Sequence, residues 1–204
     1  MIKLFLLGVI VLIYLHILIH FNVNPDNSIQ LLHEISRENI ENEIMLKLPF
    51  YFNGLTINNS DISMNNMKET DKSYESITIL EPYVKFFPNH KLYQIEKKKY
   101  LKLHENKECR NFYKITQGIM WFICIHPKYK LLFQKKNKQY ICDKIMIKNM
   151  KMNSDYIHVV LHKDSVLFLP NHWLLFGIAK EHCILEKIQY STIMNQPCFF
   201  MNGI

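Results

Sequence analysis

The sequence predicts a mainly β protein, an antiparallel sandwich or barrel preceded by an apolar N-terminal helix. Three observations support this prediction. From Ile77 onward, about nine short apolar or alternating runs are separated by polar turns, and no long helical pattern interrupts them. The segment from Leu4 to Phe21 contains no charged side chain. Hydrophobic residues make up 49% of the 204 residues, which excludes global disorder and allows one substantial core.

The N-terminal segment reads LFLLGVIVLIYLHILIHF and is nearly long enough to cross a bilayer. Its 18 residues would form about 27 Å of helix at ~1.5 Å per residue, against a hydrocarbon core of ~30 Å. His16 and His20 lie near its C-terminal end, where a neutral imidazole reaches the headgroups. No small-x-small cleavage site follows in Asn22-Val23-Asn24-Pro25. We therefore predict an uncleaved signal anchor that lies in the lipid bilayer through residues 4–21. A cleaved signal peptide is the alternative.

The charges that flank this segment predict its orientation. Lys3 precedes it, whereas the next basic side chain apart from histidine is Arg37, after Asp26 and Glu34. The positive-inside rule then places the N-terminus in the cytoplasm and the rest of this single-pass chain on the lumenal or external side. The sequon at Asn58 would be usable only on that side.

The remainder divides into two parts, so that the chain has an anchor (1–23), a juxtamembrane helix with a polar linker (24–76) and a β domain (77–204). Ser28 is a suitable N-cap for a helix from Ser28 to Met45 with apolar residues at helical spacing. The polar stretch 53–76 reads as a linker. In the β domain, the uninterrupted apolar run from Ile119 to Ile125 is typical of a strand covered on both faces.

Composition argues against nucleic acid as a partner. The formal charge of +7 comes almost entirely from lysine, because Arg37 and Arg110 are the only arginines. Surfaces that read phosphate usually depend on arginine, whose planar fork binds it through two bonds. The chain has 5 glycines and neither GxGxxG nor GxxxxGK[ST], so it lacks a glycine-rich phosphate loop. A lysine-rich surface remains suited to anionic lipid.

The five cysteines do not form a zinc ribbon, because none lies in a CxxC pair. Cys124 and Cys183 occur in apolar runs and are predicted to be buried. Cys109, Cys142 or Cys198 would be available for pairing in a lumenal domain, and the odd total leaves at least one thiol free.

Two segments resemble a known family. The first is Arg110-Asn111-Phe112-Tyr113-Lys114-Ile115-Thr116-Gln117-Gly118, which is followed by an apolar strand and His126-Pro127. The second runs from Val159 to Trp173 and contains Lys163-Asp164 at a turn, then Pro170 and Trp173. Their order is similar to that of a cupin-like domain of the JmjC type, over roughly Ile77 to Tyr190. The resemblance implies a double-stranded β-helix, which is a form of jelly roll, with Trp173 packed in the barrel.

Many members of that family are iron(II) and 2-oxoglutarate dependent hydroxylases, whose metal is held by His-x-Asp/Glu and a distant His. In this chain Leu175 stands where the resemblance places the distant His. His104 lies near the first ligand position and Asn106 near that of the carboxylate; a neutral amide is the weaker ligand. The literal His162-Lys163-Asp164 falls on the expected turn. The metal triad is therefore predicted to be degenerate.

These observations predict a membrane-anchored, cupin-like pseudoenzyme with a binding or structural role, without catalytic residues, metal or cofactor. Its further partner would be a protein or a small molecule that the sequence does not identify. The alternative is a membrane-tethered hydroxylase that uses iron(II) and 2-oxoglutarate with a shifted metal site. A shifted register would draw ligands from His104, Glu108 and His172, with Glu105 as another carboxylate. The two hypotheses differ in whether these side chains lie close enough together to bind one metal ion.

Overall fold

The computed structural model describes residues 2–33, 37–53, 86–133, 135–136, 139–140 and 144–192. Its helices are α1 (Ile2–Phe21), α2 (Arg37–Met45), the 3-10 helix η4 (Pro127–Leu132) and α4 (Lys144–Met152). Its strands are β1 (Gln30–Leu31), β2 (Phe50–Phe52), β3 (Phe86–Ile95), β4 (Tyr100–Glu105), β5 (Arg110–Gln117), β6 (Met120–Ile125), β7 (Lys135–Lys136), β8 (Gln139–Tyr140), β9 (Ile157–Leu161), β10 (Val166–Pro170), β11 (Leu174–Ala179) and β12 (Cys183–Thr192).

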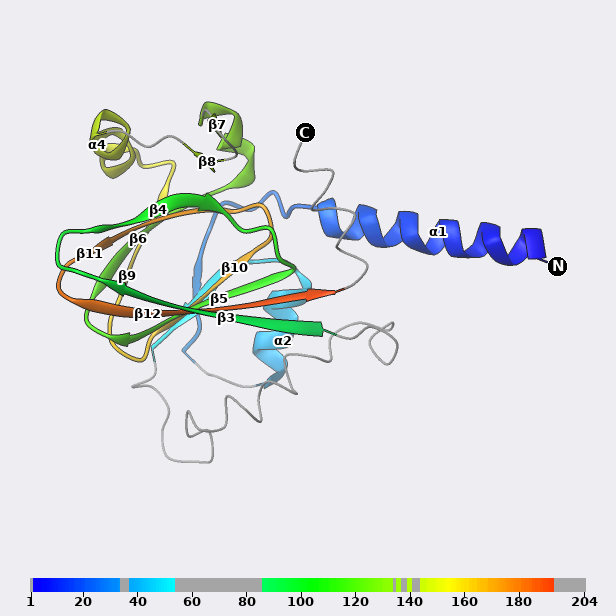
Figure 1. Cartoon of the computed structure of the whole chain (residues 1–204), viewed down its shortest axis with the longest axis horizontal. Helices are drawn as coiled ribbons and strands as arrows, with labels where there is room; N and C mark the ends of the chain where they lie inside the picture. Colours follow the sequence, from blue (N-terminus) through cyan, green and yellow to red (C-terminus); the bar gives the residue numbers. More distant parts are fainter. Residues whose placement is uncertain are drawn as a thin grey trace.

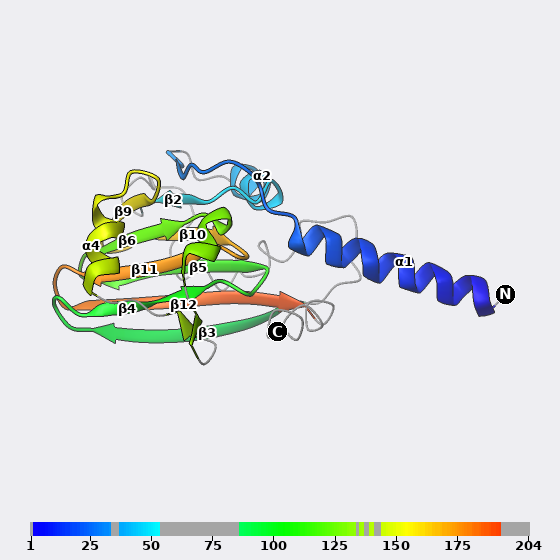
Figure 2. The same ribbon diagram turned by 90° about the horizontal axis from the view of Figure 1, so that it is seen from above.

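Two sheets face each other and form a flattened barrel (Figures 1 and 2). The six-stranded sheet has the order β1-β2-β10-β5-β12-β3, and the four-stranded sheet has the order β4-β11-β6-β9. Apart from the parallel pair β1/β2, the neighbours in both sheets are antiparallel. From β9 to β12 each strand lies in the other sheet from the one before it, as in a jelly roll. The predicted mainly β jelly-roll class is confirmed.

Side chains alternate between the barrel interior and its outer faces, because successive residues of a strand point to opposite sides. On β5, Tyr113 and Ile115 belong to the interior cluster, whereas Phe112 belongs to the cluster on the outer face. Trp173 lies in the interior cluster, as predicted. The buried Cys124 and Cys183 lie there too, and both are free thiols.

Both outer faces are covered. Ile40 and Ile44 of α2 pack on the six-stranded sheet, and Met150 of α4 packs on the four-stranded sheet. Strand β6 is therefore enclosed by apolar groups on two sides, which confirms the interpretation of its uninterrupted apolar run.

The helix predicted from Ser28 to Met45 is shorter in the structure. It begins at Arg37, and Gln30–Leu31 instead form β1 beside β2. Ile29 and Leu32, which suggested a helical stripe, pack against the two clusters of the six-stranded sheet. Segment 24–76 thus contributes β1, α2 and β2 to the same sheet and core as the later strands. The stretch 54–76, with the Asn58 sequon, lies outside the described residues, as do Cys142 and Cys198.

Among the residues that the structure describes, no helix is found that is long and apolar enough to cross a membrane.

Candidate functional site

One end of the barrel interior is polar. Most of the interior cluster is apolar, but polar side chains gather where β4 leads into β5 and in the middle of β12. This polar end consists of His104, Asn106, Glu108, Asn111, Tyr113, Lys187 and Gln189. In Figure 1, the turn from β4 to β5 lies on the side of the barrel from which α1 extends.

His104 and Asn106 are joined through Tyr113. The His104 ring places Nδ1 2.9 Å from the Lys102 carbonyl oxygen and Nε2 2.9 Å from the Tyr113 hydroxyl. That hydroxyl donates to Asn106 Oδ1 at 2.5 Å. Leu175 is the cross-strand partner of His104. A hydrogen-bonded chain and a leucine therefore occupy the positions where the resemblance places metal ligands.

The environment of His104 opposes a positive charge on its ring. Burial, and then the nearby Lys187 ammonium, lower the pKa of His104 to about 4. In the neutral ring, Nδ1 donates to the Lys102 carbonyl, and Nε2 lies beside the Tyr113 hydroxyl without a proton of its own.

Lys187 is the second charged group of the polar end. Its side chain projects inward from β12, its residue is 5% exposed, and its Nζ lies 5.1 Å from the centroid of the Tyr113 ring. Burial, and then Lys91 on the adjacent β3, lower the pKa of Lys187 to about 8, while Glu108 acts in the opposite sense. Within the described parts of the chain, Lys187 forms no ion pair. A buried ammonium without a paired carboxylate is costly, and a ligand anion would offset that cost.

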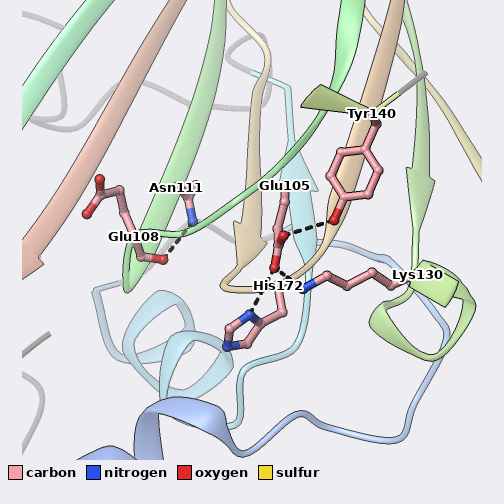
Figure 3. Close-up of polar contacts among 6 residues, drawn as sticks. All are labelled: Glu105, Glu108, Asn111, Lys130, Tyr140 and His172. Carbon is pink, nitrogen blue, oxygen red and sulfur yellow. Dashed lines mark hydrogen bonds and ion pairs between the residues drawn. The ribbon is translucent and has the colours of Figure 1, made fainter. Parts of the chain in front are cut away.

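Two further polar groups of this end have atoms that are able to form additional hydrogen bonds. In the described structure, Asn106 Nδ2 and Glu108 Oε2 are buried without a hydrogen-bond partner. Burial raises the pKa of Glu108, while the ammonium groups of Lys187, Lys91 and Lys107 act in the opposite sense. By contrast, Asn111 is well satisfied: its amide donates to the Glu108 and Leu169 carbonyls and accepts from Gln189 (Figure 3 shows the Glu108 contact). Asn111 therefore fixes the loop that carries Glu108.

A groove reaches His104 from outside. It lies between β3 and β4, which are the edge strands of the two sheets, and it encloses about 690 Å³. That volume falls within the range of ~300–1,000 Å³ usual for small-molecule sites. Its charged lining is mainly basic, with Lys99 and Lys102 against Glu96. Of the residues of the polar end, His104 belongs to the lining of this groove.

A second polar cluster lies on the outer side of the four-stranded sheet. Glu105 is adjacent to His104 in sequence and so faces the other way. Its carboxylate accepts from Lys130 Nζ at 2.5 Å, from the Tyr140 hydroxyl at 2.9 Å and from His172 Nδ1 at 3.3 Å (Figure 3). Because its lone pairs are occupied by these donors, Glu105 serves to join η4 and β8 to the barrel.

The structure separates the side chains proposed for a shifted metal site. His172 contacts Glu105, whereas His104 contacts Tyr113 in the interior. Across the described ranges, no group of three or more His, Cys, Asp or Glu side chains is arranged to hold a metal ion. The other candidate pair, His162 and Asp164, lies at the turn between β9 and β10, as predicted, with Asp164 at φ 65°.

The Glu105 cluster should make stability depend on pH. Burial alone would raise the pKa of Glu105, but hydrogen bonds from His172, Lys130 and Tyr140, together with the Lys130 charge, hold it at about 2. Since this lies below the unfolded value of 4.5, the stabilisation is complete above about pH 5 and is lost as pH falls toward 2. Lys130 is partly exposed, so we expect a loss of about 2–3 kcal/mol in the free energy of unfolding.

Denaturant unfolding of the full chain in detergent at pH 5 and pH 2.5 would measure this loss. Glu105→Gln should flatten the pH dependence, whereas Glu96→Gln, at an exposed position, should preserve it. An equally steep pH dependence in Glu105→Gln would show that other carboxylates control acid stability.

Comparison with known proteins finds similarity only at the level of structure. No protein-family model matches the chain, and no curated protein matches it. A cupin superfamily protein from Desulfitobacterium hafniense is 13% identical over 53% of this chain and 77% of its own, with a TM-score of 0.32. A cupin-2 domain protein from Shewanella frigidimarina is 14% identical over 50% and 69%, with a TM-score of 0.30. The coconut allergen cocosin is 11% identical over 52% of this chain and 22% of its own, with a TM-score of 0.35.

Proposed function

We propose that this chain is a single-pass, membrane-anchored, cupin-like domain with a non-catalytic binding role. The anchor is supported by the surroundings of α1. Its apolar side chains are exposed, including Leu4, Phe5, Leu7, Ile10 and Tyr14, and the helix extends away from the barrel (Figure 2). In the sequence, the charge-free stretch from Leu4 to Phe21 would form about 27 Å of helix at ~1.5 Å per residue, close to a hydrocarbon core of ~30 Å. A helix that is apolar on every side requires an apolar medium.

We further propose that the ligand is a small anion, such as a carboxylate, bound at the polar end of the barrel. The observation that carries this proposal is the buried ammonium of Lys187, which has no ion pair among the described residues. Asn106 and Glu108 provide polar atoms that the fold leaves unused, and His104 belongs to the lining of the groove between β3 and β4.

Isothermal titration of the full chain in detergent with succinate, citrate and inorganic phosphate tests the ligand. We expect binding of at least one anion, and its loss in Lys187→Met, because the cation is removed while most of the side-chain volume is kept. Lys114→Met is the matched control, since Lys114 lies on the outer side of β5 near Glu186. Binding should also weaken as pH rises through about 8, where Lys187 loses its proton. Equal affinities in both variants would refute this site.

The non-catalytic role predicts that the full chain neither holds iron(II) at micromolar concentration nor converts 2-oxoglutarate to succinate. Leu175 opposite His104 removes one nitrogen donor, and Asn106 replaces an anionic ligand with a neutral amide. Loss of even an outer-shell partner typically costs ~10–100-fold in metal affinity. Metal analysis and turnover assays check this prediction, and binding of 2-oxoglutarate without turnover is compatible with it. Stoichiometric iron binding that disappears in His104→Ala and His172→Ala would establish the hydroxylase instead.

A further inference from the structure

The C-terminal end of α2 exposes two large apolar side chains. Met45 is 62% exposed and Leu46 is 58% exposed, whereas Ile40 and Ile44 of the same helix are buried against the six-stranded sheet. The helix ends here because Lys47 adopts a left-handed conformation, with φ 52°. Met45 and Leu46 are therefore apolar residues that the core does not use.

This exposed pair lies beside the end of α1. The Leu46 carbonyl accepts from Asn24 Nδ2 at 2.9 Å, and Lys47 Nζ donates to the Asn22 carbonyl at 2.6 Å. Asn22 directly follows Phe21, the last residue of α1. The three steps along the chain from Phe21 to Asn24 span at most about 11 Å when fully extended. Because Lys47 contacts the carbonyl of Asn22, the first residue after α1, Leu46 lies close to the point where α1 ends.

The segment between α1 and the barrel is fixed to the domain at further points. His126 Nε2 donates to the Asn24 carbonyl at 2.8 Å, and Asn27 Nδ2 donates to the Asp155 carbonyl at 3.0 Å. Asn24 is thus held between the end of α2 and the start of η4. These contacts keep Leu46 next to the anchor and restrict how far the barrel can swing from it.

We infer that Met45 and Leu46 lie in the headgroup layer of the bilayer and form a second membrane contact beside α1. This inference rests on the proposed anchor. The occupant is a lipid surface because the hydrogen bonds to Asn22 and Asn24 hold these side chains at the point where the anchor leaves the hydrocarbon. A bilayer interface accepts exposed leucine and methionine. The polar end of the barrel, on the same side of the domain, would then lie near the membrane surface.

Photocrosslinking of the full chain tests the inference. The photoreactive residue p-benzoylphenylalanine is placed at Met45, Leu46, Leu12 or Leu92, one position per variant, and each variant is reconstituted in vesicles of phosphatidylcholine and phosphatidylserine. Leu12 lies within α1 and reports the anchor itself. Leu92 is the matched control, because it is 64% exposed on the edge strand β3. Lipid adducts are then measured by mass spectrometry.

We expect lipid adducts at Met45, Leu46 and Leu12, and their absence at Leu92. Adducts at Leu12 without any at Met45 or Leu46 would overturn the second contact while leaving the anchor standing. Absence of adducts at all four positions would overturn the anchor and the inference together. Equal adduct yields at Leu92 and Leu46 would overturn the claim that this part of the surface is the one that faces lipid.

Discussion

Replacement of Trp173 by alanine should abolish the folded domain. The side chain is 1% exposed, lies in the interior cluster and meets the His126 ring edge-on, with 5.1 Å between the ring centroids. Truncating a buried Trp typically costs ~3–5 kcal/mol, because the cavity cannot collapse fully. A loss of that size approaches the total stability of many domains, which is ~5–15 kcal/mol. His126 also holds Asn24, so the effect should extend to the segment after α1.

The matched control for this variant is Trp121→Ala. Trp121 is partly exposed on the outer side of the four-stranded sheet, where it stacks on His158 and contacts Lys180. Urea unfolding of the full chain in detergent, followed by circular dichroism, should give a small loss for Trp121→Ala and no cooperative transition for Trp173→Ala. An unchanged midpoint for Trp173→Ala would show that this residue does not support the core.

Several strands of the barrel were predictable from local signals, whereas β1 and β2 were not predicted as strands. The uninterrupted apolar run around β6 indicated burial on both faces, and α4 with η4 on one side and the interior on the other now explain it. The turn at Lys163-Asp164 was likewise evident from its residues. The start of α2 was not predictable in the same way. The spacing of Ile29 and Leu32 fits one face of a helix, but in the structure these residues lie outside α2 and pack against the two clusters of the six-stranded sheet.

The candidate site was only half predictable. His104 and Asn106 were found through the resemblance, but Lys187 was missed. The sequence of a strand shows which residues share a face, but it does not show which of the two faces points into the barrel. Strand β12 has a register shift between Ile184 and Leu185, after which Leu185, Lys187 and Gln189 face inward. The available signal was the parity that Lys187 shares with Cys183 and Leu185, both of which lie in the interior cluster. The same rule explains why Glu105 is not a partner of His104, since adjacent residues lie on opposite faces.

A single arginine in the middle of α1 should strongly reduce membrane insertion. The stretch from Leu4 to Phe21 contains 14 Leu, Ile, Val or Phe residues. At about −0.3 to −0.6 kcal/mol each, these residues supply at most about −4 to −8 kcal/mol of insertion free energy. Leu12 is central in this stretch, where arginine costs ~2.5–3.5 kcal/mol. That cost corresponds to a factor of about 70–400 in the insertion equilibrium, at 1.36 kcal/mol per tenfold.

Insertion of the full chain into microsomes, followed by alkaline carbonate extraction, measures this effect. We expect the unmodified chain and Leu12→Ala to stay in the membrane pellet, because alanine keeps the segment uncharged. Leu12→Arg should release a larger share of the chain than Leu12→Ala does, and a chain that starts at Asn24 should be found entirely in the supernatant. Release of the unmodified, uncleaved chain by carbonate would refute the anchor. Retention of Leu12→Arg at the level of Leu12→Ala would show that another part of the chain holds it to the membrane.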